Sequence, residues 1–491
     1  MELSEQYRVN TVTLETIEVT ERAVTFEYDV DGDTNTLKFE YDSISLNDPA
    51  LHADSEALRT YAVSLGVVCL GRFGAVLPSY FDITRYAPWV HPGLLTFLKK
   101  VLPHHWSEHR YQLNCLDYYV PEFIYDQATL GSKVKLPIWG LTDSLQHKVM
   151  VASGSGKDSL LCEQILRAAG IEHESFTYLY DLYGDLSRQN EIFDRLTGAI
   201  PSDRKHILKI YDDYAPWLDK RLDRFGLVEE VRSSEAAKPF RTEAGEVFAG
   251  SFAMVPIQIV RGIGLQIFGN EKSADFPNVV DKETGESISH QFAKSIYGEE
   301  SMFRLYELMF SNVNRVSITK PIHDVAIFKK LFELSGELPY STNSCNIEKP
   351  WCGRCEKCLY VFAGFAAFGD HRRTVAAFGR DLFDAPEILL VWEDLLGLRD
   401  RIAWECVGHP EETQLYFYKA RNRGITGAAI DMFADKILEP LSRAKSHEEI
   451  AHHFAAIEDK YSMVHTDHHH MPSWLSDKVL GVLSAQGQRV L

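Results

Sequence analysis

A short segment rich in glycine and serine carries the residues with the clearest chemical potential in this chain. Residues 148–152 are mostly apolar, as in a buried strand, and residues 158–169 have the spacing of an amphipathic helix. Gly154, Ser155 and Gly156 form the turn between them. Backbone N–H groups of such a turn, and those of the first helical turn, converge on one place and attract an anion. The segment therefore predicts a phosphate site, and we expect the phosphate to belong to a nucleotide.

The Walker A loop is the obvious alternative, and the sequence excludes it. That loop needs a longer gap between its glycines and a hydroxyl residue directly after its lysine. In this chain a single residue separates Gly154 from Gly156, and Asp158 follows Lys157. The order Gly154-Ser-Gly-Lys-Asp-Ser159 instead resembles the pyrophosphate loop of enzymes that split ATP into AMP and pyrophosphate while they adenylate a substrate. An ordinary Gly/Ser turn, with Asp158 complementing the helix dipole, is the structural alternative.

Length, composition and charge restrict the class of protein. A chain of 491 residues exceeds one comfortable core, so we expect two or three domains. The net charge of −19 disfavours nucleic acid as a partner, so basic residues must gather locally if the substrate is anionic. The start of the chain is polar and acidic, unlike a secretory signal, and no apolar run approaches a membrane span. These features predict a cytoplasmic protein with a small-molecule substrate and no membrane partner.

Half of the eight cysteines lie in one short stretch of the chain. Cys345, Cys352, Cys355 and Cys358 include two overlapping C-x-x-C turns, in which backbone N–H groups can bond the sulfur atoms, and Gly353 eases the tight turn. Four thiolates close a tetrahedral site without an open position, so we predict a structural zinc ion. Disulfides are disfavoured in a reducing compartment. An iron–sulfur cluster is the remaining alternative.

The pattern of apolar residues divides the chain into three expected domains. Residues 1–144 form a mixed α+β domain, with antiparallel strands over residues 10–46 that turn at Asp31-Gly32 and with helices after them. Residues 145–385 alternate short strands with helices, which predicts an α/β fold with a doubly wound parallel sheet and a ligand at the carboxyl ends of its strands. Residues 386–491 are mostly helical. Strands in the second domain are expected over residues 148–152, 174–180, 264–269 and 315–318.

Further segments resemble one family of enzymes. A pyrophosphate loop followed by C-x6-C-G-x-C-x-x-C also occurs in 7-cyano-7-deazaguanine synthases, but that family does not account for the rest of the chain. The remaining segments are similar to the UDP-N-acetylmuramoyl-L-alanyl-L-glutamate epimerases of bacterial wall synthesis, most closely between Val149 and Gly408. These segments are Gly269–Ala274, Ser289–Lys294, Ser344–Asn346, Trp351–Cys358, Phe378–Leu382 and Glu405–Gly408.

This resemblance implies an ATP pyrophosphatase domain of the pyrophosphate-loop, adenine nucleotide alpha hydrolase-like, type at residues 145–385. It also implies the activity: adenylation of the terminal glutamate of a UDP-linked muramoyl dipeptide, inversion of its α carbon from L to D, and release of AMP and pyrophosphate. Adenylation removes the carboxylate charge that suppresses loss of the α-proton and supplies a carbonyl that accepts the electrons as an enolate. Two alternatives stay open. They are nitrile, amide or peptide-bond formation, as in the deazaguanine synthases or an amidotransferase-like ligase, and a non-catalytic nucleotide sensor.

Residue roles follow from the resemblance and from the expected elements. We expect the pyrophosphate of ATP to be held by Gly154, Ser155, Gly156, Lys157 and Ser159, with Asp158 orienting it through magnesium or a loop amide. Magnesium is expected because the departing pyrophosphate needs charge neutralisation. Asn270, Glu271 and Lys272 follow a strand end and should face the site, where Lys272 can stabilise phosphoryl or enolate charge. An ordinary turn with an ion pair is the alternative there.

Proton transfer needs a base on one face of the α carbon and an acid on the other. We favour His290 for one of them, with Lys294 one turn later if the segment is helical. Glu271, Lys272 or Cys406 is the candidate for the second. A cluster of histidines, His465 and His468–His470, has spacing that suits surface metal capture, but we expect it to be a solvated loop.

Overall fold

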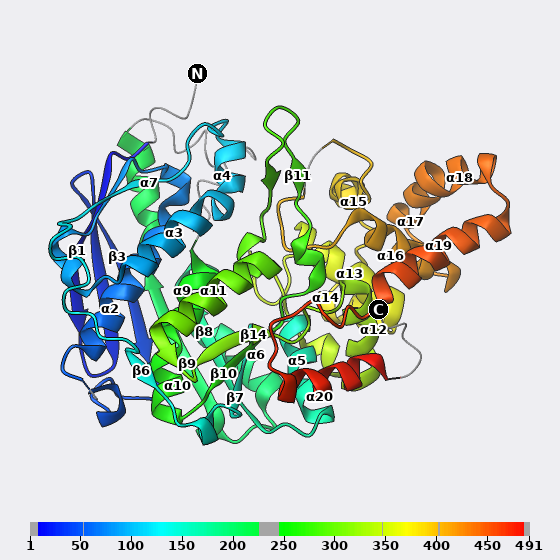
Figure 1. Ribbon diagram of the computed structural model, residues 1–491. Coiled ribbons are helices and arrows are strands. Elements are labelled where there is room, and N and C mark those ends of the chain that lie inside the picture. Colours follow the sequence, from blue (N-terminus) through cyan, green and yellow to red (C-terminus); the bar gives the residue numbers. More distant parts are fainter. Residues whose placement is uncertain (1–7, 53, 225–244, 346, 401–402, 486–491) are drawn as a thin grey trace.

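The computed structural model describes residues 8–52, 54–224, 245–345, 347–400 and 403–485 (Figure 1). The polar N-terminal residues 1–7 and the motif residue Asn346 therefore lie outside the described residues. A ten-stranded sheet in the order β14-β10-β7-β8-β9-β3-β2-β1-β4-β5 forms the centre. Its strands are β1 (Thr11–Val19), β2 (Ala23–Val30), β3 (Asp33–Tyr41), β4 (Tyr80–Asp82), β5 (Glu122–Ile124), β7 (Val149–Ala152), β8 (His173–Tyr180), β9 (Lys205–Asp212), β10 (Leu265–Phe268) and β14 (Asn314–Ser317).

Parallel pairing dominates the sheet, which confirms a mixed α/β fold. Strands β14, β10, β7, β8 and β9 are all parallel. Four of them lie within a few residues of their expected positions, whereas β9 was not expected from the sequence. The predicted N-terminal hairpin is also present: Asp31 and Gly32 have φ values of 53° and 87°, as a tight turn between twisted strands requires. Strand β3 pairs antiparallel with β9, so β1–β3 extend the same sheet as the central strands. The division into three domains stays a prediction.

Two short pairs of strands lie outside the large sheet. They are β6 (Trp139–Gly140) with β13 (Phe310–Ser311) and β11 (Val279–Val280) with β12 (Ser287–Ile288).

Helices cover both faces of the sheet, because alternate residues of a strand point to opposite sides. In β7, Met150 belongs to one buried cluster, while Val149 and Val151 belong to another. The first cluster packs beneath α2 (Ala57–Val68), α3 (Pro92–His105), α9 (Glu246–Ala253), α10 (Val255–Arg261) and α11 (Ile296–Met309). The second includes α5 (Lys157–Ala168), α12 (Asp324–Ser335) and α13 (Glu356–Phe368). Helices α4 (Ser107–Gln112), α6 (Leu186–Thr197) and α7 (Tyr214–Arg224) complete this part.

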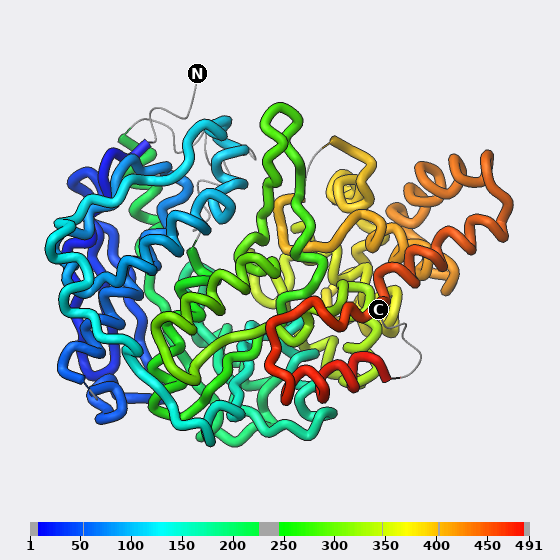
Figure 2. The backbone as a smooth tube through the Cα atoms, viewed as in Figure 1, coloured from blue at the N-terminus to red at the C-terminus, as the bar shows by residue number. Residues whose placement is uncertain are grey.

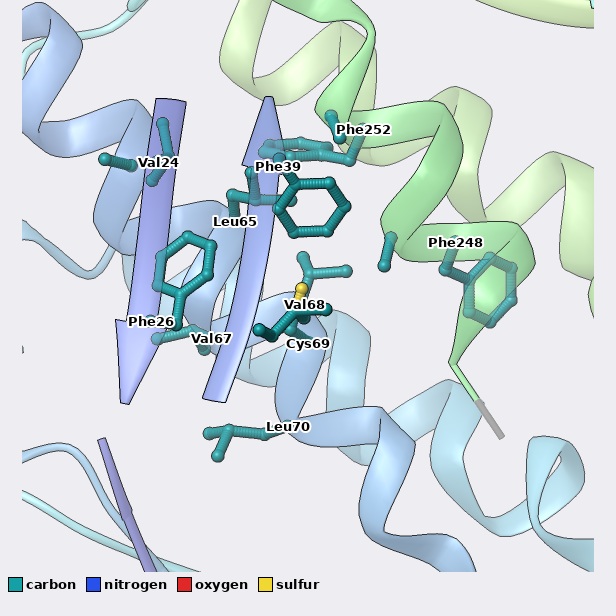
Figure 3. Packing of buried hydrophobic residues seen from close by; sticks show 14 of the residues in the cluster. Val24, Phe26, Phe39, Leu65, Val67, Val68, Cys69, Leu70, Phe248 and Phe252 are labelled. Atoms are coloured by element: carbon teal, nitrogen blue, oxygen red, sulfur yellow. The ribbon is translucent and has the colours of Figure 1, made fainter. Parts of the chain in front are cut away.

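Aromatic side chains of the hairpin strands fill the first cluster. Phe26 of β2 and Phe39 of β3 meet edge to face, with ring centroids 6.2 Å apart. Figure 3 shows both rings with Leu65 and Val68 of α2, and with Phe252 of α9 on the far side. Because a strand presents every second residue to one face, the alternation of Val24, Phe26 and Tyr28 is sufficient to create this buried surface.

The chain beyond residue 388 is helical, as expected. Figures 1 and 2 show α18 and α19 extending away from the sheet, while α20 returns and packs against α5. Among the described residues, no helix combines the length and apolar character that a membrane crossing requires. The helices are α14 (His371–Phe378), α15 (Leu389–Leu395), α16 (Pro410–Asn422), α17 (Ala428–Phe433), α18 (Glu439–Ala444), α19 (His447–Ser462) and α20 (Ser473–Ser484).

Close packing before β10 makes Gly264 a sensitive position. A Cβ atom there would lie 2.5 Å from the Cα atom and 2.6 Å from the carbonyl oxygen of Gln146, and this backbone cannot give way cheaply. We expect Gly264→Ala to lower the free energy of unfolding by about 1–3 kcal/mol, measured as a shift in the urea midpoint. The control is Gly481→Ala in α20, where a Cβ meets nothing within 4 Å and helix propensity should add about 0.5–1 kcal/mol. Equal midpoints for the two variants would contradict this packing.

Candidate active site

The predicted phosphate loop joins β7 to α5. Gly156 is the N-cap of the helix, and Ser155 before it is buried with a left-handed φ of 61°. Ser155 therefore adopts a left-handed angle although it carries a Cβ atom. Asn343 donates its N–H to the Ser155 carbonyl at 2.8 Å. A Cβ at Gly156 would lie 2.9 Å from Ser344 Oγ, so glycine there permits the close approach of the segment that leads into the cysteine cluster.

A cavity of about 1080 Å³ opens at the carboxyl ends of β7, β8 and β10. This is the end of a parallel sheet at which ligands bind in α/β proteins. Its volume exceeds the range of roughly 300–1,000 Å³ that is usual for small-molecule pockets. The walls come from segments far apart in the sequence: residues 152–156, 176–179, 268–271, 290–294, 343–344, 356–357 and 404–406, with further contributions from α4, α6 and α7.

The cavity brings together most of the residues singled out in the sequence. The predicted site residues that line it are Gly154, Ser155, Gly156, Asp158, Ser159, Asn270, Glu271, His290 and Lys294. Two predicted residues, Lys157 and Lys272, are not among the residues that line the cavity. The physical reasons differ for the two lysines.

Lys157 is buried on the far side of the loop. Its Nζ atom lies 2.6 Å from Asp158 Oδ1 and 2.5 Å from Asp324 Oδ1, and 5.2 Å from the centroid of the Phe328 ring. Burial alone would lower the pKa of Lys157, but Asp158, Asp324 and Glu271 together raise it well above its usual value. The lysine is therefore a fixed cation that orients Asp158, and its ammonium group is held away from the cavity.

Lys272 lies in the 3-10 turn η8 (Lys272–Asp275), directly after the strand end. Its backbone N–H donates to the Ile322 carbonyl at 2.8 Å, and the turn directs its half-buried side chain away from the cavity. Burial lowers the pKa of Lys272, and its ammonium interacts electrostatically with His323 and His465. Lys272 was expected to face the site because it follows the end of a strand. The end of a strand fixes the position of a residue but not the direction of its side chain.

The segment from His290 to Lys294 does not form the α-helical turn considered in the sequence. Only Phe292–Lys294 is helical, as the 3-10 turn η9, and yet both side chains reach the cavity. His290 Nδ1 lies 2.6 Å from Glu108 Oε2. Burial would lower the pKa of His290, but Glu108 and Cys406 raise it well above its usual value. Glu108, on α4, had no recognisable signal in the sequence.

Cys406 joins this histidine and lysine at the cavity wall. Lys294 Nζ donates to Cys406 Sγ at 2.9 Å, and Lys357 Nζ donates to the Cys406 carbonyl oxygen. Lys294 is half-buried, and burial would lower its pKa, but Cys406 and Glu271 raise that pKa above its usual value. A thiol, an ammonium and an imidazole from separate parts of the chain thus meet in one place.

Four buried polar atoms on the cavity wall have no hydrogen-bond partner among the described residues. They are Asn270 Nδ2, Gln291 Oε1, Asn343 Oδ1 and Ser344 Oγ. Buried polar groups are nearly always paired in folded proteins, because an unpaired one costs free energy. Orphaned atoms on residues that line one cavity are therefore a sign of a polar ligand. Lys294, Lys349 and Lys357 place positive charge in the same cavity, as an anionic ligand in an acidic protein requires.

The four clustered cysteines can hold one metal ion. The sulfur atoms of Cys345, Cys352, Cys355 and Cys358 all lie within 4.8 Å of one another. The Cys345–Cys355 and Cys352–Cys358 separations are 4.0 and 3.7 Å, too long for disulfide bonds but close to the edge of a tetrahedron with metal–sulfur bonds of about 2.3 Å. Gly353, with φ 64°, forms the turn between two of them, as expected.

Backbone N–H groups stabilise the sulfur atoms of this cluster. Ile347 and Glu348 donate to Cys345 Sγ at 3.4 and 3.3 Å, and Cys358 donates to Cys355 Sγ at 3.4 Å. The cluster also borders the cavity, because Asn343 and Ser344 precede Cys345, and Lys357 stands between two of the cysteines. Among the described residues, no other group of histidines, cysteines or acidic residues has its ligand atoms close enough together to hold a metal ion.

The histidines near residue 468 are packed against the protein, which corrects the expectation of a solvated loop. His465, His468, His469 and His470 are all half-buried. His468 Nε2 lies 2.5 Å from Asp275 Oδ2, and the His465 backbone N–H donates to a carbonyl next to η8. Their number suggested metal capture on a surface, but the contacts show that they hold the C-terminal segment on the body of the protein.

Comparison with known proteins gives matches over parts of the chain. Residues 328–447 match the family model described as the MurL C-terminal domain. The chain is 27% identical over 311 residues to the UDP-N-acetyl-alpha-D-muramoyl-L-alanyl-L-glutamate epimerase of Xanthomonas oryzae pv. oryzae, covering 60% of this chain and 62% of that protein. Proteins of the same name from Salinispora tropica and a Micromonospora species are each 29% identical, over 33% and 55% of this chain and 37% and 56% of their own lengths. The matches thus span less than two thirds of each relative, and no solved structure matches the chain.

The left-handed conformation at residue 155 predicts contrasting effects of two substitutions. Ser155→Gly should change the free energy of unfolding by less than about 1 kcal/mol, because relief of left-handed strain offsets the greater freedom of the unfolded chain. Ser155→Val should lower it by at least about 1 kcal/mol, since a β-branched residue tolerates positive φ poorly. Urea unfolding of both variants measures the difference. A valine variant as stable as the parent would contradict the observed φ.

The cysteine geometry predicts one tightly held ion per chain. Elemental analysis of protein purified without added metal should find about one zinc per chain, since four thiolates at these separations suit a single tetrahedral ion. Cys352→Ser should lose most of the metal and melt several degrees lower, because a structural ion contributes directly to folding. Cys115→Ala, which removes a buried thiol outside the cluster, is the control and should keep its metal. Full metal content in Cys352→Ser would contradict the assignment.

Proposed function

We propose that this chain is an ATP-dependent epimerase. It adenylates the C-terminal glutamate of UDP-MurNAc-L-Ala-L-Glu, or of a similar glutamyl peptide, inverts the α carbon from L to D and releases AMP and pyrophosphate. The similarity to three epimerases supports the reaction class. The observation that carries the proposal is the single cavity in which the loop, Asn270, Glu271, His290 and Lys294 meet. Such an enzyme serves peptidoglycan precursor synthesis.

The phosphate loop and its neighbours suit the nucleotide half of this reaction. The residues from Gly154 to Ser159 would bind the pyrophosphate of ATP with backbone N–H groups at the start of α5, in a sheet of the pyrophosphate-loop type. Asp158 would carry magnesium, because it faces the cavity while Lys157 fixes it from behind. Asn270 Nδ2 and Asn343 Oδ1, which have no partner among the described residues, would meet polar groups of the substrates.

The remaining groups suit the proton transfers. Glu108 keeps His290 protonated, so the imidazolium can supply a proton to an enolate. Lys294 supplies a positive charge that stabilises the enolate oxygen, and Glu271 holds negative charge beside Lys294. Burial would raise the pKa of Glu271, but Lys157, Lys294 and Lys357 lower it, so this carboxyl group stays ionised.

A zinc ion in the cysteine cluster would have a structural role. It would fix the ends of the segment from Cys345 to Cys358, and with them Ser344 and Lys357 at the cavity wall. A fully thiolate-ligated zinc ion has no open position for substrate. Its contribution to the reaction is therefore the placement of protein groups.

Incubation in deuterium oxide tests the proposal. With ATP, magnesium and UDP-MurNAc-L-Ala-L-Glu, the protein should form AMP and pyrophosphate, and the product should contain D-glutamate with one deuterium at its α carbon. Chiral analysis and mass spectrometry measure the two outcomes. ATP cleavage without deuterium incorporation would contradict the proposed epimerase activity and favour an adenylating ligase that forms an amide or nitrile. ATP binding without turnover of any carboxylate would indicate a nucleotide sensor.

Asp158→Asn should reduce AMP formation by at least about 100-fold. The magnesium ion that neutralises the departing pyrophosphate would lose its carboxylate ligand. The substitution keeps the shape of a side chain that packs against Gly269, and Lys157 retains Asp324 as a partner. Asp203→Asn, at an exposed position in η6 (Ser202–Arg204), is the matched control and should leave the rate unchanged. Retained AMP formation in the Asp158 variant would contradict its role.

A further inference from the structure

We infer that Cys406 is the group that removes the α-proton of the activated glutamate. This inference rests on the proposed function and assigns a proton acceptor on one face of the α carbon. It is carried by the position of Cys406 within a cluster of charged groups on the cavity wall, and by the unpaired polar atoms beside them.

Three separate segments hold the thiol in place. Lys294, at the end of η9, donates to its sulfur atom at 2.9 Å, and Lys357, at the start of α13, donates to its carbonyl oxygen. His290 also interacts electrostatically with the thiol, and its Nδ1 atom is paired with Glu108 of α4. Cys406 itself lies between α15 and α16 and is half-buried, so the sulfur atom is both supported and accessible from the cavity.

The surrounding charges favour a thiolate. Burial would raise the pKa of Cys406, but Lys294, His290 and Lys357 lower it to about 6. At neutral pH the sulfur is therefore mostly anionic, while His290 and Lys294 are cationic. Glu271 lies close to Lys294 and Glu108 close to His290, so each cation is shared between an acid and the thiolate. A base with a pKa near the working pH is the kind that transfers protons efficiently.

The other cysteines do not share this environment. Cys345, Cys352, Cys355 and Cys358 form the metal cluster. Cys69, Cys115 and Cys162 are buried, and none of them lines the cavity. Burial and neighbouring acids raise the pKa of Cys162 well above its usual value, so it stays a neutral thiol. Cys406 is thus the one thiol that faces the predicted nucleotide loop.

Polar atoms on residues that line the same cavity as Cys406 support a polar ligand there. Gln291 Oε1, next to His290, and Asn270 Nδ2, next to Glu271, are buried, line the same cavity and lack a partner among the described residues. Their side chains are more than nine-tenths buried, so bulk water does not compensate them. A substrate with amide or carboxyl groups would satisfy both and would lie within reach of the thiolate.

The proton transfer balances without an additional reactant. The Cα–H bond of the glutamyl adenylate breaks, the proton forms an S–H bond on Cys406, and the electron pair moves into the carbonyl group to give an enolate. Because His290 lies on the same wall as the sulfur, its imidazolium returns a proton to the opposite face of the α carbon through a water molecule, which gives one proton to carbon as it accepts one from nitrogen. Cys406 is left as a thiol and His290 as a neutral imidazole, and proton transfer from sulfur to nitrogen restores the starting ion pair.

The first test separates adenylation from proton removal. Cys406→Ala should keep pyrophosphate–ATP exchange that depends on UDP-MurNAc-L-Ala-L-Glu within about three-fold of the parent, and should lose deuterium incorporation and D-glutamate formation by about 100-fold or more. Cys406→Ser should behave alike, because a hydroxyl group is a far weaker base at neutral pH. Cys115→Ala is the control and should retain both activities, since that thiol is buried away from the cavity.

Three outcomes would overturn the assignment. They are epimerisation by Cys406→Ala within ten-fold of the parent, loss of pyrophosphate exchange in both Cys406 variants despite native circular dichroism and metal content, and a covalent substrate adduct on Cys406 in acid-quenched protein. If the parent protein itself shows no substrate-dependent AMP formation, the proposed function fails, and this result is distinct from all three.

A second test reads the charge on the sulfur directly. The rate of iodoacetamide alkylation at Cys406, followed by peptide mass spectrometry, should have its pH midpoint at about 6. Lys294→Met should move that midpoint upward by at least about one pH unit, because it removes the cation that contacts the sulfur. A midpoint at or above about 8.5, the value of an ordinary thiol, would overturn the inference.

Discussion

The buried ammonium group of Lys157 is the interaction on which the candidate site depends. An unpaired charge in a protein interior is very costly, so this lysine requires its two carboxylate partners, Asp158 and Asp324. Asp158 lies in the first turn of α5 and Asp324 begins α12, and the other oxygen of Asp324 accepts a hydrogen bond from Tyr360 of α13. One cation therefore links the starts of two helices and is connected to a third through Asp324. The loop is positioned from behind, and Gly154, Ser155 and Gly156 line the cavity.

The second constraint is the parallel alignment of β7, β8 and β10, which brings their carboxyl ends to one edge. Segments that follow these strands must meet there, although β7 and β10 are more than a hundred residues apart in the chain. The cysteine cluster closes the same cavity from another side, because Ser344 touches the position where Gly156 lacks a Cβ atom. Local packing at one glycine thus couples the predicted phosphate loop to the segment that leads into the cysteine cluster.

Local sequence patterns predicted the strands and helices around the site well. They predicted the directions of individual side chains poorly. The β7–α5 loop, the strands around it and the cysteine cluster follow from short-range spacing, so they were predictable. Lys157 and Lys272 were both expected to face the ligand, but the direction of a side chain depends on long-range charges such as Asp324 and on the turn η8. Glu108 and the packed histidines near residue 468 make contacts with partners more than 180 residues away in the chain, and no local pattern records them. For the same reason, the pairing of β3 with β9 could not be read from either strand alone.

Charge also imposes an order on the proposed reaction. The protein carries a net charge of −19, and two of the cations in the cavity are already paired with anions, Lys294 with the Cys406 sulfur and His290 with Glu108. A substrate carboxylate that approached the thiolate would be repelled, and its α-proton would be weakly acidic. Adenylation removes that negative charge, so the activated glutamate can approach the thiolate at the moment when its α-proton becomes acidic. The electrostatics that hold Cys406 as an anion therefore also favour activation before proton removal.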